Sequence, residues 1–596
     1  MGVESQMKFF RVFLLLVVPF CLVHIVHAAE YRVSTVQQIN SLISTLQPGD
    51  VVIMENKVWT NATVVFEATG TESQPIILRA DTPGQVFLEG TSTLRIAGRW
   101  VVVDGLVFRN GYSPSGGVIE FRRSTTLASD CRLTNTAIID YNPASDSTDY
   151  KWVSIYGFRN RVDNCYFKGK RHLGTTLVVW LPDSTNPNFN VPNYHRIDRN
   201  YFGFRPVYPI NGAETIRVGD SNTSFSNSST IVELNYFEEC NGETEAISNK
   251  SCENVYRFNT FFKTQGTLTL RHGNRCLVEG NFFLGEEVSN TGGIRIIGED
   301  HVVVNNYLSR TRGTGFRSAI SMVNGVPNSL PNQYFQVKNA LVAFNTLVDN
   351  RSNFDIGTTA SGATLPPLDC AIANNLVRGY TSPLLKYTTA PINMKYEGNI
   401  FFGTSLGITQ PPGITTNLNP ELVLSTDGLW RPAATSPVRG GAQGNYPTVI
   451  EDMDGQPRTD PKDIGADQVS SSPIVRRPLT RNDVGPLWMR TTTSVAEPAV
   501  HMPDRIVLEQ NYPNPFNAST VIRFALREQS YVRLEIFGIL GQRIAVLVDG
   551  DRGAGIHSVT WSTEVSSSVY FYKLTVSSAT SSVTTSTRQR TMILTR

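Results

Sequence analysis

The sequence is poor in charge and has almost no excess of either sign. Charged residues make up 17% of its 596 positions, whereas about 25% is typical of soluble proteins. The 53 Lys and Arg residues are balanced by 51 Asp and Glu residues, so the net charge is only +2. This composition gives no polybasic surface and argues against DNA or RNA as the main partner. Hydrophobic residues at 40% and aromatic residues at 10% supply a core, which argues against general disorder.

Cysteines are scarce for a chain of this length, and no CxxC pair is present. Such spacing excludes both a dense disulfide framework and a recognisable zinc site. Without Cys21, which lies in the N-terminal apolar run, six cysteines remain: Cys131, Cys165, Cys240, Cys252, Cys276 and Cys370. One or two disulfides and buried free thiols are both compatible with this number.

Long apolar segments are missing as well. The run from Val12 to Val23 is short for a membrane span, and no later stretch approaches about 20 apolar residues. Lys8 and Arg11 flank this run, and the segment ends at Ala28, a small residue suited to cleavage. Residues 1–28 are therefore predicted to be a signal peptide, with export and no transmembrane segment after its removal.

A short unit, apolar-x-x-Asn-x-apolar, recurs through the middle of the chain. Its asparagines are Asn200, Asn235, Asn259, Asn281, Asn306, Asn345, Asn375 and Asn399, and Cys165 holds the same place in an earlier copy. The shortest intervals, 22 to 25 residues, fit one turn of a right-handed parallel β-helix, and the longer ones fit a turn with an inserted loop. Apolar residues would stack inward while the asparagine amides stack in a ladder at the turn.

The repeat therefore predicts an all-β solenoid over residues 29–468. A β-sandwich is disfavoured, because its strands would not place an asparagine at a fixed point of each unit. Val101–Phe108 extends the solenoid toward the N-terminus, and the repeats fade after Asn399. The fragment Asp452-Met-Asp-Gly is predicted to form a turn in the closing segment, since it lacks the rest of a calcium-binding loop.

Beyond the solenoid, composition changes twice. Residues 469–503 are rich in Ser, Pro, Thr and Arg and are predicted to be a linker. Residues 504–596 show alternating strands such as Val532–Ile536 and Val569–Leu574, which predict a small β-sandwich.

This C-terminal unit resembles the sorting domain of the type IX secretion system. The resemblance rests on Asn511–Asn517, Leu540-Gly541, Gly555-Ile-His557, Trp561 and Val569-Tyr570. It implies recognition by that secretion machinery, transport across the outer membrane, and release or surface attachment. A carbohydrate-binding sandwich is the alternative.

Charged residues of the solenoid cluster between Asn211 and Arg317. Lys250, Arg271 and Arg295 precede their ladder asparagines by nearly equal distances, which predicts three cations at the same place on three successive turns. Glu243 and Glu245 are two residues apart and are predicted to point the same way from one strand. Each residue alone is typical of a solvated surface, but their alignment on adjacent turns makes the cluster a candidate catalytic site.

The solenoid resembles polysaccharide lyase family 6, which comprises alginate lyases and chondroitinase B. The matching residues are Asn211, Glu214-Thr-Ile-Arg217, Asn241-Gly-Glu243-x-Glu245, Ser248-Asn-Lys250-Ser-Cys252, Leu270-Arg271-His272-Gly273-Asn274 and Arg295. The resemblance implies Lys250 as Brønsted base, Arg271 as Brønsted acid, and Asn211, Glu243 and Glu245 as calcium ligands. It also implies His272 and Arg295 as substrate contacts, and Arg217 and Arg317 are further candidates.

Together with the predicted signal peptide, this resemblance implies a secreted, calcium-dependent lyase that cleaves alginate, at mannuronate, by β-elimination. Oxygen ligands suit Ca²⁺, and the base and acid suit removal of a proton beside a uronate carboxylate. Dermatan sulfate is an alternative substrate, because it is also an anionic uronate polymer. A hydrolase that uses Glu243 and Glu245 as its acid pair, and a surface adhesin without activity, remain open.

Overall fold

The computed structural model describes two units of the chain, Met1–Arg490 and Thr491–Arg596. The residues described are 28–208, 210–490, 507–508, 511, 514, 516–526, 530–539, 541–552, 555–563, 565–578 and 585–594. Residues 1–27 of the predicted signal peptide and residues 491–503 of the predicted linker lie outside these residues. None of the described helices is long and apolar enough to cross a membrane.

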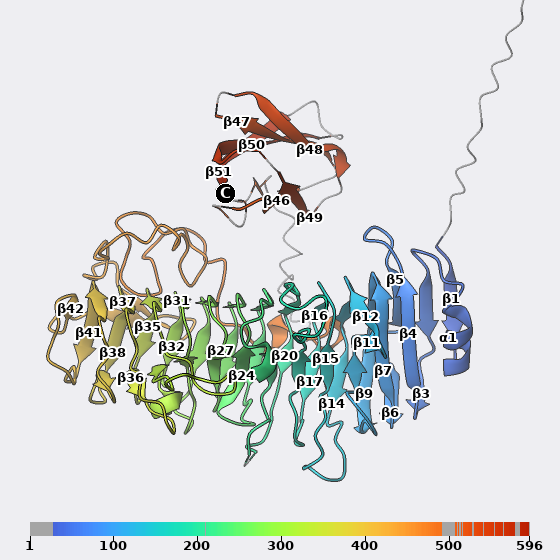
Figure 1. The fold of residues 1–596 in the computed structure, drawn as a ribbon, viewed down its shortest axis with the longest axis horizontal. Helices are drawn as coiled ribbons and strands as arrows, with labels where there is room; N and C mark the ends of the chain where they lie inside the picture. Colours follow the sequence, from blue (N-terminus) through green and yellow to red (C-terminus); the bar gives the residue numbers. More distant parts are fainter. Residues whose placement is uncertain are drawn as a thin grey trace, which may run out of the picture. The chain divides into compact units, whose positions relative to one another are not determined.

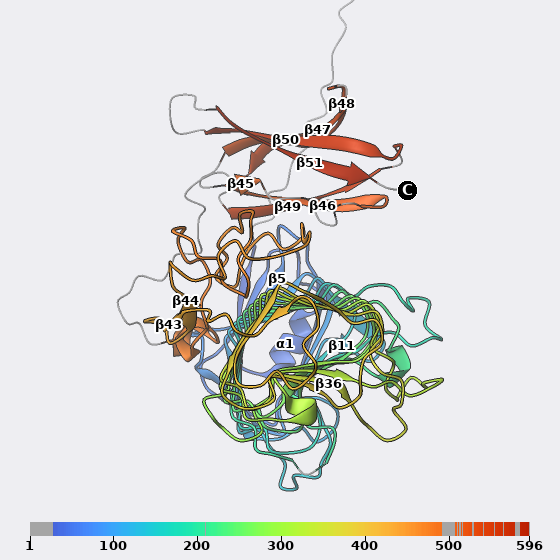
Figure 2. The same cartoon turned by 90° about the vertical axis from the view of Figure 1, so that its left-hand side faces the viewer.

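The first unit is a solenoid of three long parallel sheets, A, B and C, each with 14 strands (Figures 1 and 2). Sheet A contains β1 (Glu30–Val33), β2 (Val51–Met54), β5 (Ile76–Ala80), β8 (Val101–Asp104), β13 (Arg132–Thr134), β16 (Arg161–Asp163), β19 (Arg196–Asp198), β22 (Ile231–Glu233), β25 (Val255–Arg257), β28 (Leu277–Glu279), β31 (Val302–Val304), β34 (Leu341–Ala343), β37 (Ala371–Ala373) and β40 (Lys395–Glu397). Sheet B contains β3 (Val58–Thr60), β6 (Val86–Gly90), β9 (Leu106–Gly111), β14 (Ala137–Ile139), β17 (Tyr166–Lys168), β20 (Tyr201–Phe202), β23 (Tyr236–Glu238), β26 (Thr260–Phe262), β29 (Phe282–Leu284), β32 (Tyr307–Ser309), β35 (Thr346–Val348), β38 (Leu376–Gly379), β41 (Asn399–Gly403) and β42 (Ile414–Thr415).

Sheet C carries the charged residues singled out above. It contains β11 (Arg122–Arg123), β12 (Thr126–Ser129), β7 (Thr93–Arg99), β10 (Ile119–Glu120), β15 (Val153–Ile155), β18 (Leu177–Val179), β21 (Ile216–Gly219), β24 (Glu245–Lys250), β27 (Thr267–His272), β30 (Ile294–Ile296), β33 (Ile320–Val323), β36 (Phe354–Thr358) and β39 (Leu385–Tyr387), with β4 (Thr63–Thr69) beside β7. Helix α1 (Val36–Leu42) lies at the N-terminal end of the solenoid and buries Ile39 there (Figure 1). The predicted parallel β-helix is confirmed.

The asparagine ladder is present as predicted. Asn259 illustrates its bonding: its Oδ1 accepts from the backbone N–H and the Nδ2 of Asn235, both at 3.0 Å. Its own Nδ2 donates to Oδ1 of Asn281 at 3.0 Å and to the Val232 carbonyl at 2.9 Å. The ladder starts at Cys165, whose backbone N–H donates to Oδ1 of Asn200 at 2.9 Å. Each buried amide thus satisfies hydrogen-bonding groups of the turn before it, and this explains why asparagine recurs at this position.

Removing one ladder amide should destabilise the solenoid. We expect Asn259→Ala to lower the free energy of unfolding by about 1–3 kcal/mol for each buried partner left unsatisfied, because these groups lose the amide that bonds to them. Urea unfolding followed by circular dichroism measures this change. Asn40→Ala, at an exposed position of α1, is the control and should have little effect. Equal stability of the two variants would contradict the ladder's role.

Aromatic rings stack in the interior. Phe167, Phe202, Phe237, Phe261 and Phe283 follow one another on successive strands of sheet B, with ring centroids 5.3, 4.9, 4.6 and 4.5 Å apart. Because parallel strands repeat at about 4.8 Å, this spacing matches the rise of one turn. The stack fills the core and keeps the turns in register.

A second polar column lies at the turn between sheets C and A. The backbone N–H of Cys276 donates to Nδ1 of His301 at 3.2 Å, just as the N–H of Thr230 donates to Oδ1 of Asn254 on another turn. Burial lowers the pKa of His301 from 6.5 to about 4. The six cysteines that remain after Cys21 are all buried and free, so the thiol alternative is the correct one.

This histidine gives stability a pH dependence. His301 binds a proton below about pH 6.5 in the unfolded chain, but only below about pH 4 in the folded chain. The folded state therefore has its full stability above pH 6.5 and loses stability as the pH falls toward 4. Asn takes the equivalent place on other turns, so we expect His301→Asn to reduce this loss by roughly 3 kcal/mol between pH 7 and pH 4. Urea unfolding at several pH values measures it. Parallel pH profiles of wild type and variant would contradict the assignment.

The closing segment folds back on the outside of the solenoid. It includes β43 (Leu422–Leu424) and β44 (Trp430–Pro432), and its side chains Leu429, Met453 and Ala466 pack on Phe282, Tyr307 and Val348. Asp452 forms the predicted turn: its Oδ1 accepts from the N–H groups of Asp454 and Gln456. The neighbouring Asp454 and Asp467 are paired with Arg431.

The expected linker does not begin at residue 469. Residues 475–490, which we call the strap, continue along the solenoid and contain the short 3₁₀ helices η3 (Arg481–Asp483) and η4 (Leu487–Met489). Val484 is buried beside Tyr201, Arg481 pairs with Glu238, and Nε1 of Trp488 donates to the Asn135 carbonyl at 2.9 Å. The strap is bound to the solenoid by these contacts, of which only Val484 is a buried apolar one. Its sequence therefore resembles that of a linker.

The second unit is a small antiparallel β-sandwich. One sheet contains β45 (Val507–Leu508), β46 (Ser519–Leu526) and β49 (Gly555–Ser562), and the other contains β48 (Arg543–Arg552), β47 (Ser530–Gly538), β50 (Ser568–Ser578) and β51 (Thr585–Leu594). Their facing side chains, including Phe524, Trp561 and Tyr572, form one core. The predicted sandwich is confirmed. Of the residues that carry the sorting-domain resemblance, Tyr512, Pro513, Pro515 and Leu540 lie outside the described part of the chain.

Candidate active site

A polar cavity of about 700 Å³ lies on the outer face of sheet C. Its position follows from the strands beneath it: in β21, β24, β27 and β30 alternate residues point into the core, and the residues between them point outward. The cavity is lined by Val207, Tyr208, Ile210, Asn211, Ser221, Asn241, Glu243, Thr244, Glu245, Lys250, Gln265, Arg271, Asn290, Arg295, Phe316, Arg317, Asn332 and Tyr334. Most of the predicted site residues are therefore brought together.

Lys250 ends strand β24 and points into this cavity. In the register of sheet C it lies between Gly219 on β21 and His272 on β27. Its side chain is half-buried, and no hydrogen bond or ion pair holds Nζ among the residues that the structure describes. Nζ therefore faces the cavity without a protein partner among these residues.

The three cations do not form the straight column that their spacing predicted. Arg295 pairs with Thr269, not with Arg271, and Lys250 pairs with His272. The β27–β30 pair has no register shift and aligns Arg295 two residues before Arg271. In the β24–β27 pair, a register shift after Asn249 places Lys250 opposite His272 and leaves Arg271 unpaired in that register. A bulge of this kind re-aims side chains and is common beside active sites. The cations still converge, because Arg271 and Arg295 both approach Glu245, at 3.8 and 3.3 Å.

Arg271 is held in place by a loop that sequence inspection did not identify. Its Nη1 donates to the Gln333 carbonyl at 2.9 Å and its Nη2 to the Asn332 carbonyl at 3.2 Å. The ring of Tyr334 lies 4.1 Å from its guanidinium carbon. Burial lowers the pKa of Arg271 below the ordinary range of a guanidinium. This environment orients Arg271 and makes it a better proton donor.

His272 lies behind Arg271 and does not line the cavity. It is 1% exposed, and its Nε2 lies 2.8 Å from Nη1 of Arg271, which donates to it. Burial and the charge of Arg271 lower the pKa of His272 to about 3. The neutral ring therefore serves as an acceptor for Arg271, and the direct substrate contact predicted for His272 is absent from the cavity wall.

Three carboxylates meet at one end of the cavity. Glu214, Glu243 and Glu245 each place an oxygen within 4.8 Å of the other two. Oε2 of Glu214 and Oε1 of Glu243 are buried and have no hydrogen-bond partner. Burial, together with the charges of Glu214 and Glu245, raises the pKa of Glu243 to about 8. These oxygens, with Asn211 on the same cavity, fit a hard divalent cation such as Ca²⁺.

Glu214 was not predicted as a ligand, although its motif was recognised. It lies in the turn before β21, and only the fold shows that this turn stands beside the turn before β24. The available signal was the spacing Asn211-Gly-Ala-Glu214, which places two oxygen-bearing side chains in one turn.

Of the three arginines predicted to contact substrate, Arg295 and Arg317 line the cavity and Arg217 does not. Arg295 is 3% exposed and packs against Phe316, 4.0 Å from that ring. Arg317 lines the cavity and donates to the Gln265 carbonyl at 3.0 Å. Arg217 lies outside the cavity lining, 5.0 Å from the Trp180 ring on the same face of sheet C. The aromatic residues Phe316 and Tyr334 were missed, because nothing in the repeat distinguishes them.

Comparison with known proteins agrees with this geometry. The family model described as chondroitinase B matches residues 33–436. A mutant of the PL6 family alginate lyase AlyGC is 36% identical with a TM-score of 0.68, over 77% of this chain and 58% of that chain. A mannuronic acid-specific family 6 lyase from human gut microbiota is 31% identical with a TM-score of 0.59, over 65% of this chain and 91% of that chain.

A PL6 family polysaccharide lyase from Pseudopedobacter saltans is 25% identical with a TM-score of 0.58, over 77% of this chain and 99% of that chain. No curated protein sequence matches the chain. The chain spans 58% of the length of the AlyGC mutant structure, so that enzyme has parts without a counterpart here. The family model nevertheless covers more than half of this sequence, and the solenoid matches along its length. The chain belongs to the chondroitinase B-like family, polysaccharide lyase family 6.

Proposed function

We propose that this protein is a secreted, calcium-dependent lyase that cleaves alginate at mannuronate residues by β-elimination. The observation that carries the proposal is the convergence of Lys250, Arg271 and the three carboxylates on one cavity. The similarity to a mannuronic acid-specific lyase supports the choice of substrate.

In this proposal Lys250 is the Brønsted base. Nζ takes the proton from C5 of the uronate, and the electrons of that C–H bond form the C4–C5 double bond. The bond between C4 and the glycosidic oxygen breaks, and this oxygen receives a proton from Arg271. One product carries an unsaturated uronate and the other carries a new hydroxyl group.

The acidic cluster would hold the calcium ion. Glu214, Glu243 and Glu245, with Asn211, would be its protein ligands, and the two partnerless buried oxygens support this assignment. When bound, calcium would neutralise the uronate carboxylate and stabilise the negative charge that develops after proton removal.

The neighbouring arginines would bind and orient the polymer. Arg295 and Arg317 line the cavity, and we assign them to the carboxylates of adjacent sugar units. His272 would act through Arg271 by accepting one of its N–H groups. Arg217 would contact the polymer beyond the cavity, where the Trp180 ring offers a surface for a sugar.

A chondroitin-type uronate polymer such as dermatan sulfate is the second candidate substrate, and the family model supports it. Sulfate groups would need additional cations near the cavity. Lys250, Arg271, Arg295 and Arg317 are the Lys and Arg residues of the cavity lining, and the mechanism above assigns all four to the uronate chain. Alginate therefore remains the better assignment.

We also propose that the protein is exported. The N-terminal segment up to Ala28 has the order of features expected of a signal peptide. The C-terminal sandwich resembles sorting domains of the type IX machinery and would direct passage across the outer membrane. Immunoblots of cells and medium test this, because removal of residues 504–596 should retain the protein in the periplasm. Equal release of the truncated and full chains would contradict the proposal.

The activity test follows ultraviolet absorbance of the unsaturated product. Polymannuronate, polyguluronate and dermatan sulfate are each incubated with the full chain, in calcium and in chelator. We expect a calcium-dependent rise that is largest with polymannuronate. New reducing ends without absorbance would instead indicate a hydrolase, and binding without either signal would indicate an adhesin.

A further inference from the structure

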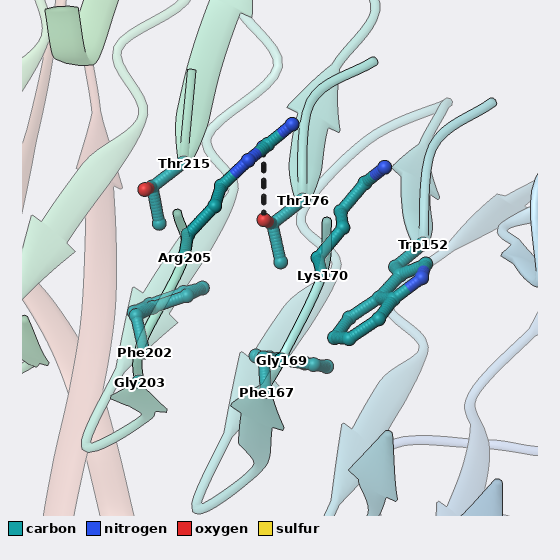
Figure 3. A pocket seen from close by; sticks show the side chains of 9 residues that line it. All are labelled: Trp152, Phe167, Gly169, Lys170, Thr176, Phe202, Gly203, Arg205 and Thr215. Atoms are coloured by element: carbon teal, nitrogen blue, oxygen red, sulfur yellow. Dashed lines mark hydrogen bonds between the residues drawn. The ribbon is translucent and has the colours of Figure 1, made fainter. Parts of the chain in front are cut away.

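A buried guanidinium lies next to the two chain segments that carry the acidic cluster. Arg205 is 2% exposed and lines an interior space that has no room for a water molecule. Figure 3 shows its side chain beside that of Lys170, both extending in the same direction within the solenoid. Burial lowers the pKa of Arg205 to about 10. A cation in such a place is costly and must be compensated by nearby groups.

The fork of Arg205 ties three backbone carbonyls together. Nη1 donates to the carbonyl of Glu214 at 2.8 Å. Nη2 donates to the carbonyls of Gly174 at 2.8 Å and His172 at 3.0 Å. A planar group with donors in fixed directions can hold carbonyls from separate turns at set distances, which a lysine cannot do. The backbone at Glu214 is therefore fixed to the preceding turn of the solenoid.

The same side chain touches the segment of the second and third carboxylates. A Cβ atom placed on Gly242 would lie 2.9 Å from Nε of Arg205 and 2.1 Å from the carbonyl oxygen of Ala213. Only glycine allows the Asn241–Glu243 backbone to approach this closely. Arg205 thus contacts both segments, one on each side, from which the carboxylates project.

The charge of Arg205 is balanced by the cluster itself. Among the described residues, no carboxylate forms an ion pair with Arg205 within 4 Å. The carboxylates that favour its charged form are Glu214 and Glu243. Neighbouring Lys170 offers no negative charge, and burial together with the charge of Arg205 lowers the pKa of that lysine well below its ordinary value. The interior cation therefore lies close to two of the three carboxylates, Glu214 and Glu243.

We propose that Arg205 is a positioning residue of the calcium site: it holds the turns of Glu214 and Glu243 at the separation that lets their carboxylates bind one ion. This inference rests on the proposed calcium site. Arg205 touches neither the polymer cavity nor the ion, and it acts through the backbone of the two segments. Residues that orient ligands in this way typically change metal affinity by about 10- to 100-fold when replaced.

Isothermal titration of CaCl₂ into the chelator-treated full chain tests the proposal. We expect Arg205→Lys and Arg205→Gln to raise the Kd for calcium by about tenfold or more. Arg205→Lys keeps the charge and loses the fork, so it separates geometry from electrostatics. The matched control is Arg458→Lys: Arg458 is also buried and donates to the Asp463 and Gly465 carbonyls, but it lies in the closing segment. Its Kd should stay at the wild-type value.

The outcomes are distinct. A wild-type protein that binds no calcium overturns the proposed calcium site and this inference with it. Binding by wild type, with the same Kd in Arg205→Lys, overturns the inference alone. An equal loss of affinity in Arg458→Lys would show that general destabilisation explains the effect. Loss of the folded state in both Arg205 variants, seen by circular dichroism, would make Arg205 a residue of the fold and also overturn the proposal.

Discussion

Lys250→Ala is expected to lower turnover on polymannuronate by about 10³-fold, with little change in KM. The base is removed while the carboxylates and Arg295 still bind the polymer, so the loss falls on the chemical step. General bases contribute about 10²–10⁴-fold, and no second amine lines the cavity. The initial rate of absorbance increase at saturating polymer measures the change.

The matched control is Lys386→Ala. Lys386 points outward from β39 on the same sheet, where it pairs with Asp355 at 3.4 Å, and it lies outside the cavity lining. Its replacement should leave turnover unchanged. If Lys250→Ala kept turnover within tenfold of wild type, another group would have to be the base.

Removal of calcium is expected to lower the rate by roughly 100-fold or more, and added CaCl₂ should restore it. A bound cation contributes several kcal/mol to stabilising charge in the transition state. Glu243→Gln should raise the calcium concentration needed for half-maximal rate, because an amide replaces one of three converging carboxylates. Titration of the chelated enzyme with CaCl₂ measures both effects.

Glu253→Gln controls for loss of a negative charge in general. Glu253 follows β24 on the same turn and pairs with Arg275 at 3.2 Å, away from the cavity. Its calcium dependence should equal that of wild type. A chelated enzyme with full activity would exclude a catalytic role for the cation and leave the acidic cluster to be explained otherwise.

The solenoid could be predicted from sequence because its information is local. Asn259 forms hydrogen bonds with Asn235 and Asn281, the asparagines of the preceding and following copies of its unit. The repeat alone therefore indicates which residues contact one another. The strap could not be predicted this way. Leu479 donates to Thr260 and Trp488 to Asn135, across 219 and 353 residues, and no repeat marks either pair.

The site was predicted in composition and less well in geometry. Lys250, Arg271 and the Glu243–Glu245 pair do line one cavity, as their motifs indicated. The straight column of cations failed for two reasons. A bulge in β24–β27 offsets Lys250 from Arg271, and the register of β27–β30 offsets Arg271 from Arg295 by two residues. Nearly equal counts along a sequence reveal neither offset. Glu214, Tyr334 and Arg205 act through contacts between turns with loops of unequal length, so their roles emerge only from the fold.

The strap changes how the solenoid comes apart. A stack of turns in which each touches only its neighbours can fray from either end, one turn at a time. Trp488 packs over Gly84 near one end, and Arg481 and Leu479 are fixed to turns farther along. Opening a terminal turn must also detach a segment bound to central ones. We therefore expect the solenoid to unfold as a single cooperative unit. During synthesis, the N-terminal turns gain their contacts with the strap only after residues 475–490 have been made.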